Sequence, residues 1–115
     1  MALKATIFKV TLSVADVGRG YYRDHDLTIA RHPSETDERM MVRVLAFALH
    51  ADGALAFGRG LSTDDEPDLV RCDLTGAIER WIDVGLPDER DIRKACGRAR
   101  EVDVLAYGGR AVELW

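Results

Sequence analysis

The stretch that decides the fold runs from residue 64 to residue 94 and reads DDEPDLVRCDLTGAIERWIDVGLPDERDIRK. Two short apolar runs, over 69–74 and 77–84, flank a Thr-Gly pair, which is typical of two strands joined by a tight turn. A Gly-Leu-Pro sequence ends the second run, and Pro87 indicates the first turn of a helix. The stretch therefore predicts a β-hairpin followed by a helix.

Carboxylates lie where these two predicted strands begin and end. Asp68 opens the first strand, directly after Pro67, while Asp83 lies at the end of the second, on the same strand face as Glu79. Acidic residues on neighbouring strands supply the oxygen ligands that Mg²⁺ or Mn²⁺ requires. The alternative is that the acids are solvent-exposed strand-end residues, and for Asp68 the sequence alone favours this alternative.

Length and composition indicate one soluble domain. The chain has 115 residues, of which 47% are hydrophobic and 31% are charged, as in ordinary globular proteins. Its net charge of −4 argues against a protein that mainly coats nucleic acid, while leaving room for a local basic face. Cys72 and Cys96 lack zinc or CxxC spacing, so we predict buried apolar residues in a reducing compartment. We find no signal-peptide pattern and expect a cytoplasmic protein.

The N-terminal part predicts a hairpin and a helix. Alternating apolar residues favour strands over 2–14 and 22–30. A helix is expected from Ser34, in a loose capping box with Asp37, to near His50. Its predicted buried stripe consists of Met40, Met41, Val44, Leu45 and Ala48.

Two further features of the helices bear on function. Glu38, one turn into the first helix, is a further candidate metal ligand, although a solvated first-turn acid is the commoner role for such a residue. The second helix should bury Ile92, Ala95, Cys96 and Ala99. Its opposite side carries a basic stripe spaced four residues apart: Arg90, Lys94 and Arg98.

Together with short strands over 54–58 and 102–107, these elements predict an α+β fold. We expect a mixed β-sheet flanked by two helices, with the N-terminal hairpin added to it. The chain ends on Val-Glu-Leu-Trp without a polar tail, so we expect it to be cut within a structural element at Trp115.

Several segments are similar to one known family. They are Ala2–Ile7 (ALKATI), Ala30–Thr36 (ARHPSET), Glu38–Met41 (ERMM), Asp64–Pro67 (DDEP) and Trp81–Glu89 (WIDVGLPDE). Together they resemble the bacterial YaeQ family, and the resemblance covers the whole chain. Because the proteins of that family are longer, residues 1–115 are expected to form the N-terminal two thirds of the family domain.

The resemblance implies a compact variant of the PD-(D/E)XK, or restriction-endonuclease-like, fold, whose core runs helix, three strands, helix, strand. In such nucleases a Pro-Asp pair and an acid-x-Lys pattern on adjacent strands bind Mg²⁺ and activate a water against a phosphodiester. Asp68 and Asp83 match the two acids. Gly85 occupies the lysine position, and Lys94 on the following helix, ahead of Arg93 or Arg90, is the candidate for a displaced lysine.

Two functions are therefore open. The first is a metal-dependent phosphodiesterase acting on DNA or RNA, with Asp68, Asp83 and Lys94 as catalytic residues and with Mg²⁺ or Mn²⁺ held by Asp83, Asp68, Glu79 and Glu38. The second is a non-catalytic nucleic-acid- or protein-binding module that keeps the nuclease core as a scaffold and binds through the basic stripe, in a salt-sensitive way. Loss of activity on Asp83→Asn substitution would distinguish the first from the second.

Overall fold

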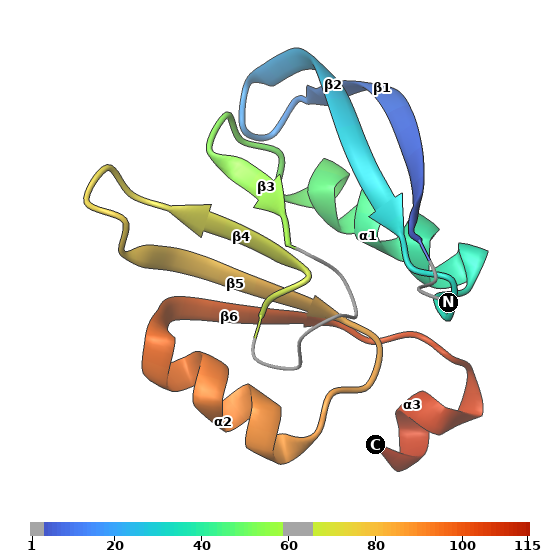
Figure 1. Cartoon of the computed structure of the whole chain (residues 1–115). Helices are drawn as coiled ribbons and strands as arrows, with labels where there is room; N and C mark the ends of the chain where they lie inside the picture. Colours follow the sequence, from blue (N-terminus) through green and yellow to red (C-terminus); the bar gives the residue numbers. More distant parts are fainter. Residues whose placement is uncertain (1–3, 59–65) are drawn as a thin grey trace.

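The computed structural model describes residues 4–58 and 66–115. Within these ranges the elements are β1 (Thr6–Asp16), β2 (Tyr21–Arg31), α1 (Asp37–Leu49), β3 (Leu55–Phe57), β4 (Leu69–Cys72), β5 (Ile78–Val84), α2 (Glu89–Arg98), β6 (Ala99–Leu105) and α3 (Arg110–Leu114) (Figure 1). From α1 to β6 the order is helix, three strands, helix, strand, as expected from the sequence.

The strands form two sheets. β1 and β2 make a long antiparallel hairpin, in register from the Thr6–Arg31 pair to the Asp16–Tyr21 pair. The second sheet has the strand order β3-β4-β5-β6, in which β5 and β6 are parallel and the other neighbours are antiparallel. A parallel pair needs a crossover connection, and α2 provides it. The predicted mixed sheet and N-terminal hairpin are confirmed.

The core lies between α1 and the mixed sheet. Its buried members are Ala46, Phe47, Ala51, Leu55, Leu69, Ile82 and Val84, and the hairpin packs Leu12, Val14 and Leu27 against them. Burial of each large apolar side chain contributes about 1.5–3 kcal/mol. This packing holds α1 against the ends of β4 and β5, where the candidate site lies.

The start of α1 differs from the prediction. The helix begins at Asp37, because Thr36 rather than Ser34 is the N-cap: the Thr36 hydroxyl oxygen accepts a hydrogen bond from the Arg39 backbone N–H at 3.1 Å. This bond satisfies one of the amide groups that every helix leaves unpaired at its first turn.

The predicted apolar stripe of α1 is wrong in part. The buried residues of the helix are Met40, Arg43, Ala46 and Phe47. Met41 and Leu45 are instead 55% and 52% exposed. The buried face contains Arg43. Because the prediction used apolar residues alone, it rotated the buried face away from Arg43 and toward Met41 and Leu45.

The cysteine prediction is also wrong, because Cys72 and Cys96 are both exposed. On α2, Ala95 is fully buried and Ile92 is half-buried, whereas Ala99 already begins β6. The helix is short and strongly charged, so it contacts the sheet along a narrow stripe that leaves Cys96 outside.

Some predictions cannot be followed in the structure. Residues 2 and 3 of the first predicted strand, and Asp64 and Asp65 of the DDEP segment, lie outside the described residues. In the part of the chain that is described, no helix has the length and apolar character needed to cross a membrane.

Candidate functional site

Asp68 and Asp83 lie side by side where β4 begins and β5 ends. Leu69 pairs with Ile82, so Asp68 and Asp83 are the next pair along the two strands. The Asp68 backbone N–H donates to the Ile82 carbonyl at 3.0 Å and approaches Asp83 Oδ1 at 3.4 Å. In return, Asp68 Oδ2 accepts a hydrogen bond from the Val84 backbone N–H at 2.8 Å. The structure thus brings together the two acids that the sequence singled out.

A close backbone approach fixes the position of Asp68. The Gly58 N–H donates to the Asp68 carbonyl at 2.8 Å. A Cβ atom at position 58 would come within 1.9 Å of the Pro67 carbonyl oxygen, which no side chain tolerates. Glycine at the end of β3 therefore allows the Pro-Asp pair to sit against the sheet.

A cation from α1 neutralises Asp68. Arg39 Nη2 donates to Asp68 Oδ1 at 2.8 Å, and Arg39 Nη1 donates to Glu35 Oε2 at 2.6 Å. Arg43 Nη2 donates to the other oxygen of Glu35 at 2.6 Å and to the Ala30 carbonyl at 2.7 Å. Two arginines and two acids thus form one chain of charge-assisted hydrogen bonds that ties α1 to the start of β4.

The members of this network lie at different depths. The side chains of Glu35 and Arg43 are each 1% exposed, whereas that of Arg39 is 17% exposed. Buried charges are tolerated only when they are paired and hydrogen-bonded. The inner Arg43–Glu35 pair is therefore structural, and Arg39 is the member that reaches toward the surface.

Asp83 is the electrostatically unfavourable member of the site. Burial raises its pKa above the usual 3.8, and the negative charge of Asp68 raises it further. The nearby Trp81 indole, the Asp68 amide and the charge of Arg39 oppose this rise without cancelling it. Within residues 4–58 and 66–115, the buried Trp81 indole N–H has no hydrogen-bond partner, so it acts on Asp83 as a nearby dipole. Asp83 would gain from a further cation beside it.

Gly85, two residues after Asp83, has a backbone conformation that favours glycine. Its φ is +97°, a region that residues with a Cβ rarely adopt. Space is not the obstacle, because a Cβ there would meet Tyr107 Cε1 at 3.8 Å, an ordinary contact. Burial raises the pKa of that tyrosine above its usual 10.0, and the charge of Arg39 opposes the rise. Tyr107 and Arg39 therefore border the site next to Gly85.

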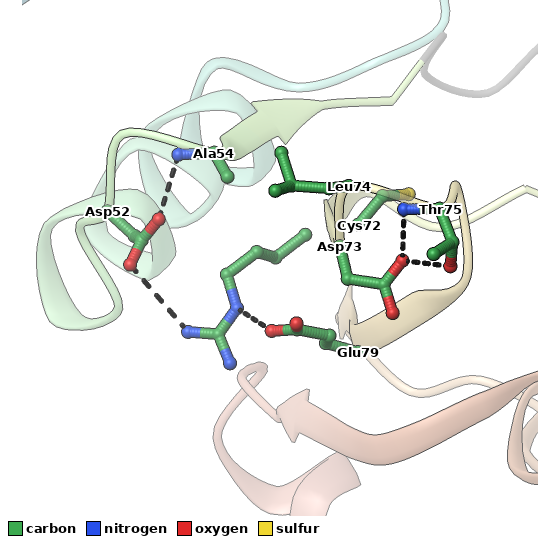
Figure 2. Close-up of a pocket in the computed structure, with 8 residues that line it drawn as sticks. Asp52, Ala54, Cys72, Asp73, Leu74, Thr75 and Glu79 are labelled. Carbon is green, nitrogen blue, oxygen red and sulfur yellow. Dashed lines mark hydrogen bonds and ion pairs between the residues drawn. The ribbon is translucent and has the colours of Figure 1, made fainter.

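Glu79 lies away from this pair. It accepts a hydrogen bond from Arg71 Nε at 3.1 Å, and Arg71 also approaches Asp52 at 3.9 Å. These residues line an open hollow of about 660 Å³, which Asp73 and the turn that follows it also line. Figure 2 shows the Glu79 carboxylate directed into this hollow, where its charge is already balanced by Arg71.

The other predicted site residues are exposed. Glu38 lies in the first turn of α1, where its charge helps to raise the pKa of Tyr107. Lys94 lies in the middle of α2, with Arg90 and Arg98 along the same helix. Across the described ranges, no three His, Cys, Asp or Glu side chains are grouped to hold a metal ion. The four acids predicted as metal ligands therefore do not form a single cluster there.

The chain is similar to known proteins along its whole length. A family model described as YaeQ protein matches residues 1–115. The chain belongs to the YaeQ family. Relatives described as uncharacterized YaeQ proteins include those of Escherichia coli (strain K12), 55% identical, and Salmonella typhi, 54% identical, each over 116 residues. Each match covers 100% of this chain and 64% of the relative, so the chain spans less than two thirds of these YaeQ proteins.

Crystal structures of YaeQ proteins have the same fold over this region. The protein from Xanthomonas axonopodis pv. citri is 61% identical and superposes with a TM-score of 0.92, covering 96% of this chain and 63% of that one. The protein from Pseudomonas syringae is 45% identical with a TM-score of 0.90, covering 94% and 60%. The family resemblance inferred from the sequence is confirmed.

Three residues of the site were not predicted from the sequence: Arg39 and Arg43 of α1, and Glu35 just before the helix. A signal was present, because residues spaced by four lie on one face of a helix and an acid followed by two arginines at that spacing can form ion pairs. Tyr107 carried no local signal, since it reaches the site only through the pairing of β6 with β5.

Proposed function

We propose that this chain contributes Asp68 and Asp83 to a divalent-metal-dependent phosphodiesterase site that acts on DNA or RNA. The observation that carries the proposal is the juxtaposition of these two carboxylates on adjacent strands, with the pKa of Asp83 raised by burial and by the charge of Asp68. Perturbed acids next to each other are typical of functional sites. We also propose that the core from α1 to β6 is of the restriction-endonuclease-like type, which the element order supports.

The two acids fit Mg²⁺ or Mn²⁺. Mg²⁺ keeps several waters and is commonly bound through one or two carboxylates together with phosphate oxygens of the substrate. Asp83 is the main ligand in this proposal, because its hydrogen bond from the Asp68 amide is long at 3.4 Å. Asp68 already accepts two hydrogen bonds at 2.8 Å and contributes a remaining lone pair. A bound metal would lower the pKa of a coordinated water and stabilise negative charge on the phosphate.

Of the other predicted residues, the proposal leaves out Glu79 and keeps Glu38 and Lys94 as predictions. Glu79 is left out, because it lines a separate hollow with Arg71, away from Asp68 and Asp83. Glu38 stays a prediction as an outer ligand that would act through a metal-bound water. Lys94 stays a prediction as the displaced lysine.

The direct test is cleavage of DNA and RNA by the wild type, Asp83→Asn and a matched control, Glu79→Gln, with Mg²⁺ or Mn²⁺. The control removes a carboxylate from the same strand and the same strand face. We expect Asp83→Asn to lose about 100-fold or more in cleavage rate, as for removal of a principal transition-state contact, and Glu79→Gln to stay near wild type. Full activity of Asp83→Asn, or no metal-dependent cleavage by the wild type, would refute the proposal.

A binding module is the second candidate, and the exposed cations of α2 favour it. Three cations on this helix are exposed to solvent: Arg90, Lys94 and Arg98. In addition, Gly85 occupies the position at which PD-(D/E)XK nucleases have a lysine. Substituting the three by Gln should weaken nucleic-acid binding and flatten its salt dependence by about 0.7–0.9 in log–log slope for each phosphate that the variant no longer neutralises. In that case Asp83→Asn would leave binding unchanged.

A further inference from the structure

We infer that Arg39, rather than Lys94, supplies the positive charge at the scissile phosphate, in the place of the lysine that is absent at Gly85. The inference rests on the proposed function and assigns to α1 a residue that no sequence pattern around Asp83 identifies. It is carried by the position of the guanidinium, 2.8 Å from Asp68 Oδ1, at the edge of the site and partly open to solvent.

The backbone at position 85 explains why the charge comes from elsewhere. At φ +97° the backbone of a lysine would be strained, although its Cβ would fit beside Tyr107. Position 85, where the acid-x-Lys pattern would place the cation, therefore holds a glycine, which has no side chain. The charge of Arg39 acts on Asp83 itself.

Arg39 is held in place with donors to spare. A guanidinium has five N–H donors, and within the described residues Arg39 uses two of its nitrogens, Nη1 on Glu35 and Nη2 on Asp68. Glu35 is in turn fixed by the buried Arg43 at 2.6 Å. A cation anchored in this way is preorganised, so it does not have to reorient when charge develops on the phosphate.

The charge state of Arg39 suits this role. Burial opposes its charged form, but the hydrogen bonds and charges of Asp68 and Glu35 outweigh that effect and raise the pKa of the guanidinium. Arg39 therefore stays charged throughout the reaction and donates hydrogen bonds without exchanging a proton. Its planar fork matches two non-bridging phosphate oxygens better than an ammonium group does.

The reaction that Arg39 would assist is a hydrolysis without redox change. The water oxygen forms a new bond to phosphorus while the bond from phosphorus to the leaving oxygen breaks. One proton passes from the attacking water to solvent, and one passes from solvent to the leaving oxygen. Arg39 stabilises the extra negative charge on the non-bridging oxygens in between.

The test compares Arg39→Gln and Arg39→Lys with wild type in cleavage and in Mn²⁺ titration, with Arg19→Gln as the matched control. Arg19 is also paired with an acid, Asp16, three residues earlier at 2.8 Å, but in the exposed turn of the N-terminal hairpin. We expect kcat/KM of Arg39→Gln to fall about 10²–10³-fold and Arg39→Lys to fall less, with Arg19→Gln near wild type. Mn²⁺ affinity should stay the same or increase in Arg39→Gln, because a positive charge has left the site; a merely structural role would lower it.

A second measurement separates phosphate contact from folding. A substrate with a neutral methylphosphonate at the scissile position should be cleaved far more slowly than the normal substrate by wild type. Arg39→Gln should lose at least tenfold of this discrimination, and Arg39→Lys, which keeps the positive charge, should lose less. Arg39 variants that cleave and discriminate like wild type would overturn the inference and leave the metal site standing. Absence of metal-dependent cleavage by wild type would overturn the proposed function, and the inference with it.

Discussion

Replacing Glu35 by glutamine removes the negative charge that lies between the two arginines of α1. The carboxylate accepts hydrogen bonds from Arg39 and Arg43, each at 2.6 Å, and its side chain is 1% exposed. Glutamine has nearly the same shape but offers only one oxygen. Its amide N–H₂ group would face one of the guanidinium groups, donor against donor.

The cost can be worked from these contacts. One charge-assisted hydrogen bond, worth about 1.5–3 kcal/mol, is lost outright. Arg43, which is 1% exposed, also keeps a buried charge without its counter-ion. Breaking a buried pair by removing one partner costs about 3–5 kcal/mol, which is a large part of the roughly 5–15 kcal/mol that stabilises a typical domain.

The assay is equilibrium unfolding in urea, with Glu89→Gln as the control. Glu89 also pairs with an arginine four residues later at 2.6 Å, but the two side chains are 85% and 76% exposed. The same substitution there should cost no more than about 1 kcal/mol, including its interaction with the helix dipole. If Glu35→Gln lost no more stability than Glu89→Gln, the buried network would not hold α1 to the sheet, and the reasoning would be refuted.

Three further predictions concern single positions. The raised pKa of Asp83 means that the folded state binds more protons than the unfolded state between pH 3.8 and that raised value, so stability falls as pH rises through this window. Asp83→Asn should therefore be at least as stable as wild type near neutral pH, and denaturation curves should show the advantage shrinking as the pH falls through the same window. Gly85→Ala should lose about 1–3 kcal/mol in the same unfolding assay, because its φ of +97° is strained for alanine; an unchanged midpoint would contradict this. Phe47→Ala should lower the free energy of unfolding by about 3–5 kcal/mol while Leu45→Gln leaves it nearly unchanged, since Phe47 is 2% and Leu45 is 52% exposed. Comparable losses of stability in the two variants would mean that Leu45 is part of the core.

The sequence predicted those parts of the fold that depend on short-range patterns. Alternating apolar residues and the Thr-Gly turn located β4 and β5, and strand pairing then placed Asp68 beside Asp83. The register of α1 was harder, because its buried face includes Arg43, and a charged residue is assigned to the surface unless its partners are known. The spacing of Glu35 from the two arginines is a sequence signal for one such partner, whereas the other, the Ala30 carbonyl, becomes visible only when the chain is folded.

The candidate site, like the fold, could be predicted only in part. Its acids could be predicted, because each ends or begins a strand. Its cation could not, because Arg39 is 29 residues from Asp68 in the chain and meets it only through the packing of α1 on the sheet. Alternation along the sequence puts Glu79 on the strand face of Asp83, but Glu79 is the extra residue of β5 at the register shift between the Arg71–Arg80 and Cys72–Ile78 pairs. Its ion pair with Arg71 lies in a separate hollow.

The most direct test of the central claim is a calorimetric titration of wild type and Asp83→Asn with Mn²⁺. If Asp83 and Asp68 hold a divalent cation, wild type should give a saturable binding isotherm that Asp83→Asn abolishes and Glu79→Gln preserves. Because a carboxylate must be deprotonated to bind a metal, the wild-type affinity should also fall as the pH is lowered toward the raised pKa of Asp83. An isotherm that is the same for wild type and Asp83→Asn, or no binding by either, would contradict the account.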